Sequence, residues 1–134
     1  MQPLLVVAGV IVRDGRILVS QRPARAHQAL LWEFPGGKVE EGETPEQALE
    51  RELFEELGVK TRTGRIFDAS LCEYPEKRVL ILFYHSEIRE GEPNALDANA
   101  ILWARPGELK ALEFAQADIR VAQRLKNELP RTDI

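Results

Sequence analysis

A capped helix preceded by a glycine-rich stretch constrains the fold of this chain more than any other feature. Thr44 is a good N-cap, Pro45 suits the first helical position, and Gln47 completes a capping box with Thr44. Gly58 supplies the signal that ends the helix. These signals predict a helix over residues 45–57, and they set the register of every side chain along it.

This helix presents two different faces, which follow from a rotation of about 100° per residue. The apolar face, expected to pack on a sheet, consists of Leu49, Leu53 and Leu57. The acidic face consists of Glu52, Glu55 and Glu56. Ala48 is expected within the acidic face, where its small side chain would leave room for a ligand. Arg51 flanks the acidic face and can pair with Glu55 four residues later.

The rest of the chain predicts a mixed sheet. Residues 4–13 form a nearly continuous apolar run, typical of a strand buried on both faces, and Asp14-Gly15 predicts a hairpin into a second strand over 16–22. Residues 24–31 are expected to form a loop. Further strands are expected over 65–74, 79–89 and 100–104, followed by a helical turn over 106–112. A terminal helix is expected over 118–129, with Ile119, Ala122, Leu125 and Leu129 at core spacing. We predict an α/β sandwich with helices on both sheet faces, in one domain over residues 1–134.

Composition excludes several functional classes. The formal net charge is −4, from 18 basic and 22 acidic residues among 134, which argues against a module that binds duplex nucleic acid through its phosphates. A single cysteine, Cys72, forms no internal disulfide and has no zinc-type spacing with the two histidines. The sequence carries no signal-peptide pattern and no apolar run long enough to span a membrane, so a cytoplasmic location is expected.

The acidic face predicts a metal site. Three carboxylates within five residues are unfavourable together unless something positive binds them, and Mg²⁺ prefers oxygen ligands, usually a few carboxylates with substrate phosphates. A bare Glu-x-x-Glu-Glu is common on solvated helices. Here, however, Pro35-Gly36-Gly37 is expected to form a loop that offers backbone carbonyls close to the helix and leaves room for a ligand. The expected chemistry is hydrolysis of a phosphoanhydride by water, with one carboxylate as general base.

The same segment resembles the Nudix box, Gly-x5-Glu-x7-Arg-Glu-U-x-Glu-Glu-x-Gly-U, where U is a bulky apolar residue. The matching residues are Gly37, Glu43, Arg51, Glu52, Leu53, Glu55, Glu56, Gly58 and Val59. The resemblance implies an α/β/α sandwich with a mixed sheet between helices. It also implies hydrolysis of nucleoside diphosphates linked to another group, with Mg²⁺ or Mn²⁺ as cofactor.

The resemblance is closest to the MutT-like branch of this superfamily. Residues 32–38 (Trp-Glu-Phe-Pro-Gly-Gly-Lys) and 42–48 (Gly-Glu-Thr-Pro-Glu-Gln-Ala) look like that branch, and similar positions continue over nearly the whole chain. The branch implies a nucleoside triphosphate pyrophosphohydrolase that releases a nucleoside monophosphate and pyrophosphate. It implies in particular an 8-oxo-dGTP diphosphatase that cleans the nucleotide pool, acting as a monomer or a weak homodimer.

The resemblance also assigns roles to residues. Metal would be held by Glu52, Glu55, Glu56 and the carbonyl of Gly36. Gly37, Glu43 and Arg51 would support the loop and orient the acids. Asp97 lies where MutT-like enzymes place a further catalytic carboxylate, usually Glu. An equally good interpretation of Asp97 is a polar loop residue.

Three more residues are candidate substrate contacts: Arg22, Lys38 and Asp118. Asp118 has an adequate structural explanation as the N-cap of the terminal helix. Its family counterpart reads the base, and is Asp rather than Asn in cytidine triphosphate pyrophosphatases of the same branch. The alternative substrates are therefore CTP or 5-methyl-dCTP. A third hypothesis is a non-catalytic nucleotide-sensing Nudix domain, although such domains typically lack box glutamates that this chain retains.

Overall fold

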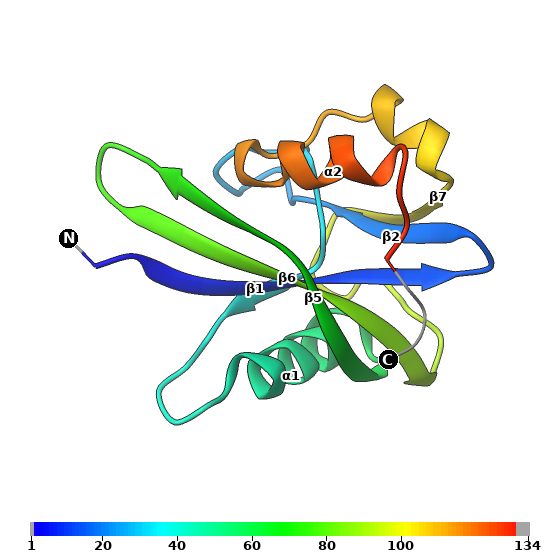
Figure 1. Cartoon of the computed structure of the whole chain (residues 1–134), viewed down its shortest axis with the longest axis horizontal. Helices are drawn as coiled ribbons and strands as arrows, with labels where there is room; N and C mark the ends of the chain where they lie inside the picture. Colours follow the sequence, from blue (N-terminus) through cyan, green and yellow to red (C-terminus); the bar gives the residue numbers. More distant parts are fainter. Residues whose placement is uncertain (1, 131–134) are drawn as a thin grey trace.

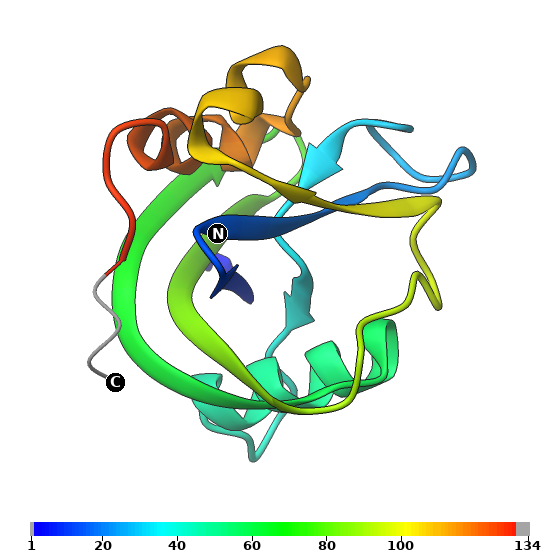
Figure 2. The same cartoon turned by 90° about the vertical axis from the view of Figure 1, so that its right-hand side faces the viewer.

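A strongly curved mixed sheet forms the centre of the protein in the computed structural model, which describes residues 2–130 (Figure 1). The strands are β1 (Leu4–Arg13), β2 (Arg16–Gln21), β3 (Trp32–Glu33), β4 (Gly36–Lys38), β5 (Lys60–Glu73), β6 (Arg78–Glu90) and β7 (Ala100–Ala104). The helices are α1 (Pro45–Leu57) and α2 (Ile119–Leu125), with 3₁₀ turns η1 (Pro106–Ala111) and η2 (Gln116–Asp118). The long β5 and β6 carry most of the curvature (Figure 2).

Strand β1 organises the sheet. The strand order is β3-β2-β1-β6-β5, while β4 also pairs with β1 and β7 with β2. Strand β1 runs parallel to β6 but antiparallel to β2 and β4. Its apolar residues alternate between the two sheet faces, since Val7 and Ile11 enter one hydrophobic cluster while Ala8 and Val10 enter the other. The prediction of a strand buried on both faces is therefore confirmed.

Each face of the sheet is covered by one helix (Figure 1). On one side α1 contributes its leucines to a cluster that also contains Leu18 and Val59. On the other side α2 contributes Val121, Ala122 and Leu125. The two hydrophobic clusters lie on opposite sides of a mixed sheet, which confirms the predicted α/β sandwich with helices on both faces.

The helix caps and the hairpin turn predicted from the sequence are both present in the structure. Helix α1 covers the predicted residues, with the Thr44–Gln47 capping box formed and Gly58 in the left-handed conformation at φ 74°. Asp14 and Gly15 both have positive φ, 52° and 74°, as a two-residue hairpin turn between β1 and β2 requires. The signals for both features lie in residues close in sequence, so the sequence predicts where they begin and end.

Three expected boundaries are wrong. The stretch around Gly36, expected as a loop, is strand β4, because its backbone pairs with β1 at Val6, Val7 and Ala8. Strand β5 begins at Lys60 rather than at residue 65, and it crosses bulges where its register with β6 shifts. The terminal helix is shorter than residues 118–129, because η2 precedes it and α2 ends at Leu125.

The positions of single side chains also differ from expectation. Ala48 is fully buried in the cluster under α1, so it is a core residue and leaves no room for a ligand on the acidic face. Ile119 and Leu129 are exposed, at 42% and 37% of their surface, whereas Val121 is buried. Cys72 is buried, as expected. In the part of the chain described, no helix has the length and apolarity to cross a membrane.

Candidate active site

Two glycines of β4 bring the main chain unusually close to its neighbours. A β-carbon at Gly36 would stand 1.9 Å from the carbonyl oxygen of Val7, in the adjacent strand β1. A β-carbon at Gly37 would stand 2.4 Å from the carboxyl carbon of Glu52, on α1. Strand β4 is therefore wedged between β1 and the acidic face of the helix. The Gly-Gly pair is required here for close approach, since any side chain would fill that space.

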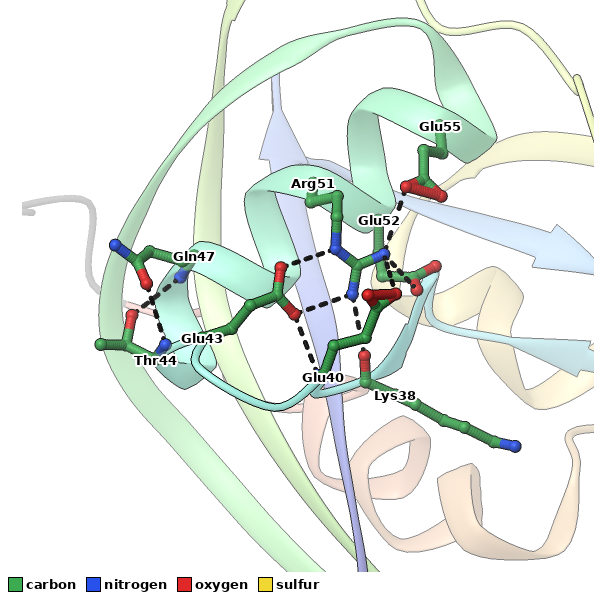
Figure 3. A network of polar contacts seen from close by, with 8 residues as sticks. All are labelled: Lys38, Glu40, Glu43, Thr44, Gln47, Arg51, Glu52 and Glu55. Atoms are coloured by element: carbon green, nitrogen blue, oxygen red, sulfur yellow. Dashed lines mark hydrogen bonds and ion pairs between the residues drawn. The ribbon is translucent and has the colours of Figure 1, made fainter.

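Arg51 organises the acidic face (Figure 3). Its guanidinium group donates two hydrogen bonds to the carboxylate of Glu43, at 2.6 and 2.9 Å. It also donates to Glu52 at 2.9 Å and to Glu55 at 3.2 Å. A further bond at 3.0 Å reaches the carbonyl oxygen of Lys38 in β4. The planar fork thus joins the loop before α1, the helix and β4, which is the supporting arrangement expected for Glu43 and Arg51.

The acids around Arg51 have pKa values shifted in different directions. Hydrogen bonding from Arg51, with a second bond from the Glu40 amide, lowers the pKa of Glu43 to about 2. Burial raises the pKa of Glu52, and Arg51 opposes that shift. Burial, together with the nearby charges of Glu52, Glu33 and Asp97, raises the pKa of Glu56 to about 8, although a backbone hydrogen bond with Gly36 opposes the shift. A positive partner beside Glu56 would favour its ionised form.

Glu56 opens into a cavity of about 530 Å³, called here the first cavity. Four carboxyl groups and two guanidinium groups line it, contributed by Glu33, Glu56, Asp97, Asp118, Arg22 and Arg25. Gly36 and Gly37 form part of its wall. The structure thus brings the predicted residues Arg22, Asp97 and Asp118 together with Glu56, although long stretches of sequence separate them. Glu52 and Glu55 are held instead by Arg51, beside this cavity.

Asp118 does not act as a helix cap. Its side chain makes no capping hydrogen bond, and the residue is 5% exposed. Burial raises its pKa well above the ordinary value, the charge of Glu33 raises it further, and a backbone hydrogen bond with Phe34 together with the charge of Arg22 opposes. Asp118 therefore occupies the N-cap position of α2, as predicted, but its side chain does not cap the helix. Its carboxyl group is positioned by the β3–β4 segment across the sheet, not by its own helix.

Glu33 and Arg22 form a hydrogen-bonded pair in the first cavity, which Asp118 also lines. Arg22 donates to Glu33 at 2.8 Å and to the carbonyl oxygen of His27 at 2.7 Å. Burial raises the pKa of Glu33, and Arg22 opposes that shift. Glu33 was not a candidate in the sequence, because it falls in a two-residue strand without recognisable periodicity. Its position two residues before Pro35-Gly36 was the only signal that it lies beside the site.

A second cavity of about 700 Å³ adjoins the first. Arg22, Glu33 and Asp118 line both cavities, together with Val6 and Ile81, so these polar side chains stand at the junction. Lys38 lines the second cavity, and its side chain points away from the Arg51 network (Figure 3). Tyr74 and Lys77, at the β5–β6 turn, line it from the other side. The site therefore has an acidic compartment next to Glu56 and a more mixed compartment next to Lys38.

The donor set fits a hard divalent cation, which is what oxygen-only carboxylate sites select. Carboxyl groups crowd the face of α1 and the first cavity, and the close approach at Gly37 brings the backbone of β4 near the Glu52 carboxyl group. Within residues 2–130, no group of three or more acidic, histidine or cysteine side chains already converges on one point. Arg51 shares its single positive charge among Glu40, Glu43, Glu52 and Glu55, so the acidic face keeps an excess of carboxylates.

Comparison with known proteins gives consistent matches. The model of the NUDIX domain matches residues 3–125. The CTP pyrophosphohydrolase of Escherichia coli strain K12 is 41% identical over 119 residues, covering 89% of this chain and 88% of that protein. The 8-oxo-dGTP diphosphatase of Haemophilus influenzae is 39% identical over 124 residues, covering 92% and 91%.

Solved structures agree with the sequence matches. The solution structure of the E. coli ORF135 protein superposes with a TM-score of 0.80 at 38% identity, covering 92% of this chain and 88% of that one. The glycine pair, the Arg51 network and the cavity beside Glu56 therefore belong to a fold shared with proteins whose names describe cleavage of nucleoside triphosphates.

Proposed function

The chain belongs to the NUDIX domain family and is a hydrolase that acts on phosphoanhydrides, and from this premise we propose that it is a Mg²⁺-dependent nucleoside triphosphate pyrophosphohydrolase. The products would be a nucleoside monophosphate and pyrophosphate. The observation that supports this proposal most directly is Glu56. Glu56 lines a cavity together with Arg22 and Asp118, and this grouping of an acid with polar and charged side chains supports the proposal of a cation and a nucleotide bound there.

Each residue has a defined role in this proposal. Glu52, Glu55, Glu56 and the Gly36 carbonyl would supply oxygens to Mg²⁺, with Mn²⁺ as an alternative. When bound, the cation would polarise the phosphoanhydride and compensate the charge of the leaving pyrophosphate. Arg51 keeps Glu52 oriented through the bonds described above. An acid of the cavity, Glu56 or Asp97, would accept the proton of the attacking water.

We propose 8-oxo-dGTP as the principal substrate, in nucleotide-pool sanitation. Asp118 and Glu33 present two carboxyl groups at the junction of the cavities. An ionised carboxylate accepts hydrogen bonds from the N1–H and amino group of a guanine. Oxidation at C8 adds a donor at N7, where unmodified guanine has an acceptor. A second acidic side chain therefore distinguishes the oxidised base from the normal one.

The same pair of acids supports a second candidate, CTP or 5-methyl-dCTP. Because the pKa of Asp118 and that of Glu33 are both raised, one group can stay protonated while the other is ionised. A protonated carboxyl donates to N3 of cytosine, and an ionised carboxylate accepts from its amino group. The relative named CTP pyrophosphohydrolase is 41% identical to this chain.

One experiment tests both substrates. The value of kcat/KM is measured in Mg²⁺ for 8-oxo-dGTP, dGTP, CTP and 5-methyl-dCTP, and the products are identified. We expect pyrophosphate release, with 8-oxo-dGTP preferred over dGTP by more than about tenfold, which corresponds to about 1.4 kcal/mol of discrimination. A preference for the cytidine nucleotides would replace the first substrate by the second. If none of the four released pyrophosphate, the proposed function would be wrong.

A further inference from the structure

Two loops face each other across the first cavity and are joined by one ion pair. Arg25, in the loop over residues 22–31, donates to Asp97, in the loop over residues 91–99, at 3.3 Å. Both side chains are well exposed, at 74% and 62%, and both line the first cavity. Figure 2 places the two loops on the same side of the molecule. The ion pair therefore lies at the entrance to the compartment that contains Glu56.

Backbone and amide contacts hold these loops in place independently of that ion pair. The side chain of Gln21 donates to the carbonyl oxygen of Leu30 at 3.1 Å and accepts from the side chain of Asn99 at 2.6 Å. The amide of Leu96 donates to the carbonyl oxygen of Glu56 at 3.2 Å. Gln21 links one loop to the other. Breaking the Arg25–Asp97 pair therefore leaves the conformation of both loops unchanged.

The two arginines that line the cavity differ in how firmly their partners hold them. Arg22 is half buried and is bound by Glu33 and by the His27 carbonyl oxygen. Arg25 has one exposed partner, at the long end of hydrogen-bonding distance. Exposed ion pairs contribute little, so a dianionic phosphate can displace Asp97 from Arg25 at small cost. A guanidinium group also matches the geometry of phosphate oxygens.

We propose that Arg25 is a phosphate-binding residue that exchanges Asp97 for the pyrophosphate portion of the substrate. The inference rests on the proposed function and adds to it the residue that holds the leaving group at the entrance of the first cavity. Four carboxyl groups line that cavity against two guanidinium groups, and Arg22 is already bound by Glu33, so few cationic groups in it are available to a polyphosphate. Arg25 supplies the compensating charge at the entrance, and the exchange releases Asp97 to face the cavity.

The test distinguishes two roles of Arg25. In one it binds phosphate, and in the other its ion pair with Asp97 only holds the two loops together at the entrance of the cavity. Affinity for inorganic tripolyphosphate is measured by calorimetry in Mg²⁺, and inhibition of turnover is measured with inorganic pyrophosphate and with dGMP. In Arg25→Ala, we expect about tenfold weaker tripolyphosphate binding and pyrophosphate inhibition, a loss of about 1.4 kcal/mol. Inhibition by dGMP should stay within about twofold of wild type. Arg25→Lys keeps the charge but not the forked geometry of the guanidinium group. Its affinity for tripolyphosphate should lie between that of wild type and that of Arg25→Ala.

A matched control comes from an exposed arginine elsewhere. Arg89 pairs with Glu87 at 3.2 Å on β6, outside the first cavity, and Arg89→Ala should change none of these affinities. Unchanged tripolyphosphate affinity in Arg25→Ala would overturn the inference, and so would an equal loss for pyrophosphate and dGMP, which would indicate closure alone. The calorimetric measurement needs no turnover. A wild-type protein that binds tripolyphosphate without releasing pyrophosphate from any nucleotide would therefore count against the proposed function and not against Arg25.

Discussion

The carboxyl group of Glu52 occupies the space in which a side chain at Gly37 would begin, with 2.4 Å between its carboxyl carbon and the site of a β-carbon. At Gly36 the corresponding obstacle is the backbone of Val7, at 1.9 Å. A carboxylate on a flexible side chain can swing away, whereas a paired backbone carbonyl cannot. Adjacent glycines therefore have different roles, one in the site and the other in the sheet.

Substituting these glycines by alanine should separate activity from stability. Gly37→Ala should fold with a melting temperature close to wild type but lose at least about 100-fold in kcat/KM, because Glu52 is displaced. Gly36→Ala should lose about 1–3 kcal/mol or more of unfolding free energy, because β4 must separate from β1. Chemical denaturation and steady-state kinetics measure the two effects.

The control for both is Gly107→Ala, because a β-carbon there meets nothing within 4 Å. That variant should match wild type in both measurements. Full activity in Gly37→Ala would contradict the close approach as a functional requirement.

Glu52→Gln should preserve the fold and abolish most activity. The amide keeps the shape of the side chain, so Arg51 and β4 stay in place, but it removes a negative charge that the proposed cation requires. We expect kcat to fall by at least about 100-fold, with an unchanged circular dichroism spectrum. Glu46→Gln, an exposed residue in the first turn of the same helix, is the matched control and should stay active. Near-normal turnover in Glu52→Gln would remove Glu52 from the metal site.

The Glu43–Arg51 pair predicts how stability depends on pH. Because the pKa of Glu43 is lowered to about 2 in the folded protein, this group stabilises the fold fully above its ordinary value of 4.5. That contribution is lost as the pH falls towards about 2. Urea unfolding of wild type and Glu43→Gln should therefore differ most above about pH 4.5, and the two proteins should converge near pH 2. A difference that stays constant over that range would contradict the assignment of the low pKa to Glu43.

Asp118 should show the opposite pH dependence. Its pKa is raised by burial, so its contribution to stability is complete below its ordinary value of 3.8 and is lost as the pH rises above it. Asp118→Asn should consequently become more stable than wild type as the pH rises towards neutrality, as measured by thermal unfolding.

The same Asp118→Asn variant tests base recognition. An amide both donates and accepts, so the ratio of kcat/KM between 8-oxo-dGTP and CTP should change by about tenfold or more. Equal losses on every nucleotide of the panel would show that Asp118 supports the fold of the site without reading the base.

The sequence predicted best what depends on neighbours along the chain. Helix α1 has the predicted bounds because Thr44, Gln47 and Gly58 satisfy its ends locally. The glycine stretch was predicted as a loop because a three-residue strand has no period to read, and β4 exists only through its pairing with β1. Asp118 was predicted as a substrate contact, and the alternative explanation as a cap arose for the same reason. Its sequence position suits a helix start, whereas its hydrogen bonding comes from Phe34, far away in the chain.

Sequence alone determined that an acidic helix face would stand beside a glycine pair, because helical spacing and capping are local properties. Only the tertiary structure decided which residues meet that face. Glu33, Arg25 and Asp97 reach the cavity beside Glu56 through strand pairing and loop contacts between distant segments. Such contacts depend on the register of β1 with β2, β4 and β6, which no short stretch of sequence encodes.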